Sequence, residues 1–183
     1  MAWRERGGGP VIGSGGPDLA TVDAAGLVLG VVAARWHLDL VDHMVGRAEA
    51  AARACRVAEV VTARVAGAVE LPVLAQALAR RCDAVVALGV VIRGETAHFE
   101  YVSRAVTEGL TRVALDEATP VTHGVLTVDT RAQAVDRAGL PDSAEDKGWS
   151  ATVAALDAAL ALRRVTRRAG PSPVAAPGGT ARM

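Results

Sequence analysis

Hydrophobic and polar positions along this chain follow two alternating patterns. Runs in which most residues are apolar or β-branched occupy residues 27–34, 57–65, 84–91 and 121–128. Runs this short, apolar on both faces, are typical of strands buried inside a parallel sheet. We therefore predict four strands at these positions.

Between these runs, apolar residues recur at the spacing of a helix. In residues 37–55, Val41, Val45 and Ala48 fall on one face, whereas charged side chains fall largely off it. A second helix begins near Pro72, because a proline in the first turn of a helix loses no hydrogen bond there. Further helices are expected at residues 98–113, at residues 130–138 with Gly139 as a C-terminal stop, and at residues 149–167.

Strands that alternate with helices predict an α/β fold in which helices cover both faces of one parallel sheet. Such a fold is a three-layer αβα sandwich with right-handed crossovers. The 183 residues suffice for one domain of this kind, which we place at residues 21–167. Residues 1–20 and 168–183 are rich in Gly, Pro, Ser and Ala and are expected to be flexible tails.

Composition narrows the classes of function. The 20 basic and 20 acidic residues cancel, which removes the electrostatic argument for nucleic acid or an anionic membrane as a partner. No apolar run reaches transmembrane length, and glycines stand where a signal peptide needs an apolar core, so we expect a cytoplasmic protein. Cys55 and Cys82 lack the spacing of a metal site or a disulfide framework, and both are expected to be buried thiols on helices.

Ligands of open parallel sheets bind beyond the carboxyl ends of the strands. Trp36 follows the first predicted strand, Glu70 the second, and residues 93–98 the third. Together they supply a flat ring, a carboxylate, a glycine turn and a histidine. Trp36 can stack on a heterocycle or cover the edge of the core, and Glu70 can bind a polyol or stabilise a helix N-terminus.

The turn Gly94-Glu95-Thr96 leads directly into a helix that begins at His98. Backbone N–H groups and the Thr96 hydroxyl can form an anion site there, provided that the Glu95 side chain points to water. An ordinary strand-to-helix turn would use the same residues. The motifs GxxxxGK[ST] and, after the first strand, GxGxxG are absent, so the turn is not a P-loop and a dinucleotide is not expected.

Histidines supply the candidate acid–base groups. His98 can transfer protons near neutral pH or can be a solvated first-turn residue, and His37 and His43 are expected at the surface of the first helix. His123 stands early in the fourth strand and Arg137 near the end of the next helix, so both should lie at the opposite edge of the sheet from His98. Only a neighbouring subunit could bring them to the same site, where Arg137 would offer a forked donor to a phosphate.

Five stretches resemble the lumazine synthase family when taken together. They are RWH, GAVELP, ALGVVIRGETAHFEYV, PVTHGVLTVDTRAQAVDRAG and DKG, in this order between about residues 27 and 162. The resemblance implies a flavodoxin-like fold with strand order 2-1-3-4. It also implies pentamers, or shells of twelve pentamers, with active sites between adjacent subunits.

The family's reaction belongs to riboflavin biosynthesis and needs neither metal nor organic cofactor. It condenses 5-amino-6-(D-ribitylamino)uracil with 3,4-dihydroxy-2-butanone 4-phosphate to give 6,7-dimethyl-8-ribityllumazine, phosphate and water. The resemblance therefore implies a transferase with these small-molecule substrates, and riboflavin synthase is a partner to consider within the pathway.

The resemblance also assigns roles by position. His98 is the expected proton shuttle. The residues expected to bind the ribitylaminouracil are Trp36, Ala68, Val69, Glu70, Val90, Val91, Ile92, His123 and Lys147, the last being the only lysine of the chain. The residues expected to bind phosphate are Glu95, Thr96 and, from the neighbouring subunit, Arg137.

Two departures from the family pattern have consequences. His123 stands where many members carry phenylalanine or asparagine, and residues 140–146 (LPDSAED) form a longer link than the glycine-rich one of shell-forming members. We expect this link to prevent shell closure and leave a free pentamer. The alternatives are a non-catalytic paralogue that binds lumazine or flavin as a pentamer, and an unrelated nucleotide-binding domain, which the absence of an acidic cluster and a glycine fingerprint disfavours.

Overall fold

Four parallel strands form the sheet at the centre of the molecule. The structure is a computed structural model that describes residues 20–167. The strands are β1 (Val28–Ala34), β2 (Glu59–Val65), β3 (Ala84–Ile92) and β4 (Val121–Val128). They pair in the order β2-β1-β3-β4, so the prediction of a parallel sheet with order 2-1-3-4 is confirmed. Residues 1–19 and 168–183, which hold the predicted tails, lie outside the described residues.

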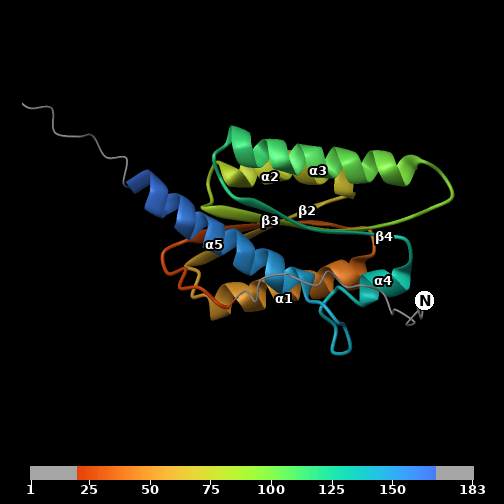
Figure 1. Cartoon of the computed structure of the whole chain (residues 1–183), viewed down its shortest axis with the longest axis horizontal. Coiled ribbons are helices and arrows are strands. Elements are labelled where there is room, and N and C mark those ends of the chain that lie inside the picture. Colours follow the sequence, from red (N-terminus) through yellow and green to blue (C-terminus); the bar gives the residue numbers. More distant parts are fainter. Residues whose placement is uncertain (1–19, 168–183) are drawn as a thin grey trace, which may run out of the picture.

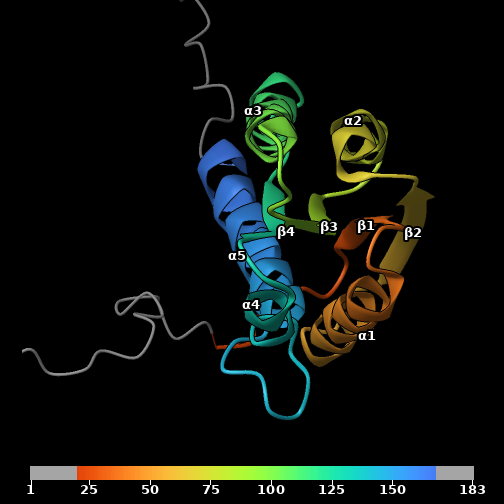
Figure 2. The ribbon, with the colours of Figure 1, turned by 90° about the vertical axis from the view of Figure 1, so that its right-hand side faces the viewer.

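Helices cover both faces of this sheet (Figures 1 and 2). One face carries α2 (Leu71–Ala79) and α3 (His98–Asp116), and the other carries α1 (Leu38–Ala54), α4 (Arg131–Val135) and α5 (Lys147–Arg167). A short 3-10 helix, Ala68–Glu70, precedes α2. The three-layer sandwich predicted from the sequence is confirmed. No helix within residues 20–167 has the length and apolar character needed to cross a membrane.

A hydrophobic core lies on each side of the sheet. Val31 and Leu88 belong to the core under α1 and α5, where Met44 and Leu156 are fully buried. Val32, the next residue of β1, belongs instead to the core under α2 and α3. This alternation explains why the strands read as continuous apolar runs, because successive side chains enter different cores.

Most predicted boundaries differ from the observed ones by a few residues, but α4 is shorter for a structural reason. The helix ends at Val135, and Ala138 forms an antiparallel bridge with Asp146. Gly139 then adopts a φ of 80°, a conformation that suits glycine. The chain therefore leaves the helix to pair with a later segment. Gly139 still marks a turn, but it does not stop a helix.

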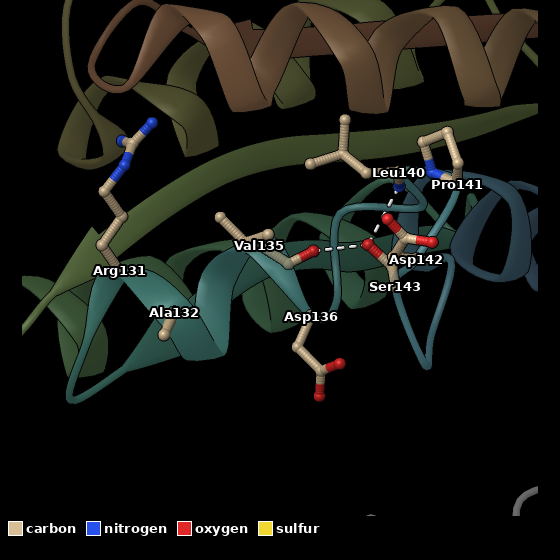
Figure 3. A pocket seen from close by; sticks show the side chains of 8 residues that line it. All are labelled: Arg131, Ala132, Val135, Asp136, Leu140, Pro141, Asp142 and Ser143. Carbon is tan, nitrogen blue, oxygen red and sulfur yellow. Dashed lines mark hydrogen bonds between the residues drawn. The ribbon is translucent and has the colours of Figure 1, made fainter.

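The link between α4 and α5 is a folded loop that projects from the α1 and α5 layer (Figures 1 and 2). Ser143 organises it, because its hydroxyl donates to the Val135 carbonyl and accepts from the Leu140 N–H at 2.9 Å (Figure 3). A pocket lies between this loop and α4 (Figure 3).

Both cysteines are buried as expected, but Cys55 directly follows α1 and Cys82 lies in the turn before β3, so neither is inside a helix.

Candidate active site

The central strand β3 extends beyond its neighbour β1 at the carboxyl edge of the sheet. The β1–β3 ladder ends with the pair Ala33 and Leu88, whereas the β3–β4 ladder continues to Ile92 and Val128. Residues 89–92 therefore have a backbone edge, on the β1 side, that is outside the sheet ladder of the described chain. This edge includes Val90, Val91 and Ile92. Backbone groups at such an edge can bond to the polar rim of a flat heterocycle.

Two loops bring an aromatic ring and a carboxylate to the same edge. Trp36 follows β1 and is 69% exposed, which is unusual for a tryptophan and leaves its ring available for stacking. Gly67 follows β2, and its N–H donates to Glu70 Oε2 at 2.8 Å. A β-carbon at position 67 would lie 3.1 Å from Glu70 Oε2 and 3.7 Å from Trp36 Cδ1, so the ring and the carboxylate adjoin this glycine.

The short 3-10 helix that precedes α2 lies next to Trp36 at this edge. Ala68 is buried there and Val69 is 51% exposed. His37 caps α1 with a left-handed φ of 54°, and its carbonyl accepts the Leu40 N–H at 3.0 Å. These residues give the edge between β1 and β2 a mixed apolar and acidic lining.

The turn after β3 presents exposed polar groups at the start of a long helix. Glu95, Thr96 and His98 are all exposed, and His98 is the first of the 19 residues of α3. The His98 N–H points to Thr96 Oγ1 at 3.4 Å. Unpaired backbone N–H groups and the helix dipole make such an N-terminus suitable for an anion.

The Arg93 side chain makes two ion pairs and one aromatic contact beside this turn. Its guanidinium donates to Asp129 Oδ1 at 2.7 Å and to Glu100 Oε1, and it lies 4.2 Å from the centre of the Phe99 ring. The bond to Asp129, and then that to Glu100, raises the pKa of Arg93, and the bond to Arg93 lowers the pKa of Glu100. Arg93 thus holds the carboxylates of Asp129 and Glu100 together beside the turn.

His123 lies away from this edge within its own chain. It pairs with Ala87 in the sheet, half-buried beneath α3, and its Nε2 is 3.2 Å from Thr107 Oγ1. Burial lowers its pKa, so the neutral ring is favoured. Within one chain, His123 thus lies beside the middle of α3, whereas His98 begins that helix.

Arg137 and Lys147 form a second group with Glu145. The Arg137 carbonyl accepts the Lys147 N–H at 3.1 Å. Glu145 lies 3.5 Å from Arg137 Nε through Oε1 and 3.2 Å from Lys147 Nζ through Oε2. One carboxylate therefore holds two cations side by side.

We predicted that a helix returning across the sheet would carry Arg137 to the opposite edge from His98. This prediction was wrong. Because α4 ends at Val135, the chain does not return across the sheet before Arg137. Instead, α4, which ends two residues before Arg137, lies on the other sheet face from α3 (Figure 2), and Gly139, two residues after Arg137, contacts α1. There His43 Nε2 donates to the Gly139 carbonyl at 2.8 Å, so His43, which was expected at the surface, is half-buried in a contact with another segment.

One chain therefore brings together only some of the predicted site residues. Trp36, Glu70, the edge of β3 and the turn up to His98 meet at the carboxyl edge of the sheet. Arg137, Lys147 and His123 do not join them. Sequence reasoning did not assign Arg93 or Glu145, although the arginine before the glycine turn and the acidic residue two positions before Lys147 were visible signals.

No group of three or more His, Cys, Asp or Glu side chains within residues 20–167 is arranged to hold a metal ion. The expectation that the reaction needs neither metal nor cofactor stays a prediction.

Comparisons with known proteins identify strong similarity over this whole region. The sequence model of the family described as 6,7-dimethyl-8-ribityllumazine synthase matches residues 26–163. A protein of Salinispora arenicola with that name is 71% identical over 161 residues, which is 86% of this chain and 97% of the relative. Proteins of the same name from Thermobifida fusca and Mycobacterium avium are 63% and 56% identical, over 84% and 85% of this chain and 89% and 97% of their own lengths.

Proposed function

This chain belongs to the 6,7-dimethyl-8-ribityllumazine synthase family, and from that premise we propose how its residues perform the family's reaction. The enzyme is a transferase of riboflavin biosynthesis. It condenses 5-amino-6-(D-ribitylamino)uracil with 3,4-dihydroxy-2-butanone 4-phosphate and releases 6,7-dimethyl-8-ribityllumazine, phosphate and water. The relatives matched over most of the chain are named as synthases, so the alternative of a non-catalytic paralogue has no support.

The pyrimidine binds beside residues 89–92 of β3, where this strand extends past β1. Trp36 stacks on its ring, and the backbone of Val90, Val91 and Ile92 bonds to its polar edge. The support for this assignment is the stretch of β3 that extends past β1, together with the exposed Trp36 ring next to Gly67. Backbone bonds at a fixed strand edge recognise the donor and acceptor pattern of a heterocycle without any reorganisation.

The ribityl chain extends from the ring toward the loop after β2. Glu70 binds its hydroxyls, and Ala68 and Val69 line the same pocket. The Gly67 N–H already holds one oxygen of the Glu70 carboxylate, which fixes the side chain in place. A carboxylate held in this way accepts hydrogen bonds from a polyol at little further entropic cost.

The phosphate binds at the N-terminus of α3. Backbone N–H groups at Glu95 and Thr96 and the Thr96 hydroxyl form one side of this site, and the Glu95 side chain points to water. Arg137 of a neighbouring chain forms the other side, with Lys147 beside it and His123 nearer to the ribityl chain. The support is that α4, which precedes Arg137, lies on the other sheet face from α3 in one chain (Figure 2). Glu145 holds Arg137 beside Lys147, and two cations with one carboxylate leave a net positive charge for an anion.

His98 transfers protons during the condensation. The 5-amino group of the pyrimidine attacks the ketone, and a proton is delivered as water leaves and the imine forms. A proton is then removed from the carbon next to the imine as phosphate is eliminated, and the resulting enol becomes a ketone. The ribitylamino nitrogen attacks this ketone, and the ring closes with loss of a second water. The imidazole of an exposed histidine can both accept and donate a proton, as these steps require. Holding the two substrates together supplies much of the remaining acceleration.

The chain assembles as a homopentamer in the cytoplasm, and riboflavin synthase is its partner in the pathway. Large apolar side chains on the α2 and α3 face support association, since Val73 is 62%, Tyr101 71% and Leu115 77% exposed in a single chain. The projecting loop of residues 140–146 supports a free pentamer rather than a shell.

The observation that carries this assignment is that Trp36, Glu70 and His98 all lie at the carboxyl edge of the sheet, while the segment of Arg137 packs against α1. We test the shared site with Thr96→Ala and Arg137→Ala, following product fluorescence. Each variant alone should raise KM for the butanone phosphate at least tenfold, because each removes a phosphate donor.

Refolding the two variants together should restore part of the wild-type kcat/KM. A mixed pentamer contains interfaces in which one chain supplies Thr96 and its neighbour supplies Arg137. Activity that stays at the level of the separate variants, in pentamers shown to contain both chains, would refute a site shared between subunits. Each variant refolded with itself is the matched control.

A further inference from the structure

The turn that carries the proposed phosphate site has few bonds of its own. Residues 94–97 are exposed, and the side-chain bond described within the turn is the 3.4 Å contact between the His98 N–H and Thr96 Oγ1. Its conformation therefore depends on how its two ends are held. One end is Arg93, whose N–H continues the sheet by donating to the Val128 carbonyl at 2.9 Å. The other end is the first turn of α3.

The Arg93 side chain connects three elements around this turn. Its Nε donates to Asp129 just after β4, its Nη1 donates to Glu100 in the first turn of α3, and its guanidinium packs on the Phe99 ring. The loop from residue 93 to residue 100 is thereby closed on itself and fastened to the neighbouring strand. A single exposed ion pair contributes little, but a forked guanidinium shared by two carboxylates and a ring restricts the geometry of all of them.

We propose that Arg93 is a positioning residue that sets the shape of the phosphate turn and the direction of the first turn of α3, through Asp129, Glu100 and Phe99. Arg93 itself does not touch the phosphate in this role. The inference rests on the proposed phosphate site at Glu95 and Thr96. It adds a residue that acts on affinity for the phosphate substrate rather than on the pyrimidine.

The decisive variant is Asp129→Ala, which removes both the negative charge and the oxygen that accepts the Arg93 Nε–H, so that geometry and charge predict opposite results for it. Removing a negative charge near an anion site would by itself tighten phosphate binding. Opening the Arg93 contact should instead weaken it. We expect KM for the butanone phosphate and the dissociation constant of inorganic phosphate to rise about threefold to tenfold, with KM for the pyrimidine changed less than twofold.

Arg93→Met and Arg93→Lys complete the series. Methionine keeps much of the length but loses both ion pairs, so it should raise both phosphate constants at least as much as Asp129→Ala does. Lysine keeps the charge but loses the fork, so it should fall between methionine and wild type. Arg112→Met is the matched control, since Arg112 pairs with Asp116 at 2.9 Å at the far end of the same helix. It should leave both phosphate constants unchanged.

Thr96→Ala, measured in parallel, separates the two levels of the proposal. Unchanged or tighter phosphate binding in Asp129→Ala, while Thr96→Ala weakens it, overturns the role of Arg93 alone. Equal shifts of KM for both substrates would also overturn it, because they indicate general damage to the fold. If Thr96→Ala leaves phosphate binding intact as well, the phosphate site itself is wrong and the role of Arg93 falls with it.

Discussion

His98 stands at the point where local sequence chemistry and tertiary placement agree. It opens α3 directly after the glycine turn, and its ring is exposed at the carboxyl edge of the sheet. Both properties follow from neighbouring residues, because β3 ends at Ile92 and the helix begins within a few positions. Its position was therefore predictable from the sequence.

Replacing His98 with asparagine should remove proton transfer while keeping a polar side chain. We expect kcat to fall on the order of a hundredfold or more, with the dissociation constant of the lumazine product changed less than threefold. Steady-state kinetics and product titration by fluorescence give both numbers. A kcat within a few fold of wild type would remove His98 from the mechanism.

Other residues show where single-residue reasoning fails. His43 was expected at the surface, but its ring donates to the Gly139 carbonyl, which is 96 positions away in the chain. Glu145 binds both Arg137 and Lys147, a role that depends on the antiparallel bridge between Ala138 and Asp146. Such contacts form only after the helices pack, and no local pattern encodes them.

At the scale of elements, the strands were predicted well because each one enters two cores and so shows a continuous apolar run. The end of α4 was not predicted. Residues 136–138 are compatible with a helix, and what ends it is pairing with residues 145–147. The start of α5 was placed slightly late for a related reason, because the Asp146 side chain caps it by accepting the Trp149 N–H at 2.9 Å.

The packing of α5 on α1 makes two helical glycines behave in opposite ways. A β-carbon at Gly148 would lie 2.4 Å from the Met44 carbonyl oxygen, which is backbone and cannot move aside easily. A β-carbon at Gly46, in α1, would meet nothing within 4 Å. Gly148→Ala should therefore destabilise the fold by about 1–3 kcal/mol, and Gly46→Ala should stabilise it by about 0.5–1 kcal/mol.

Thermal unfolding of both variants at one chain concentration checks this pair. Each variant adds the same methyl group to a helix, so each is the control for the other. A Gly148→Ala protein as stable as wild type would mean that α1 and α5 are not in such close contact.

At the scale of the whole molecule, association and catalysis are one event in the proposed assembly. In a lone chain α3 lies on one sheet face, whereas α4 and α5, which flank Arg137 and begin at Lys147, lie on the other (Figure 2), so under this proposal one chain has no complete site. The same chain exposes Tyr101 and Leu115 to water. Contact between copies would cover apolar surface and complete the site together.

The projecting loop of residues 140–146 predicts the size of the particle. We expect sedimentation and light scattering to give a mass five times that of one chain, unchanged across a wide range of protein concentration. A particle of sixty chains would contradict the proposal that this loop prevents shell closure. Reference particles of known mass calibrate both measurements.

The extension of β3 past β1 has a consequence for how this enzyme can evolve. If the pyrimidine is recognised by the main chain of residues 89–92, recognition of the ring does not depend on which side chains stand there. Val90 is constrained by the core, where it is 3% exposed, but Val91 and Ile92 are only partly buried. Positions 91 and 92 can thus accept other residues without altering which substrate is bound. Substitutions there should conserve hydrophobicity and side-chain shape rather than the identity of the residue.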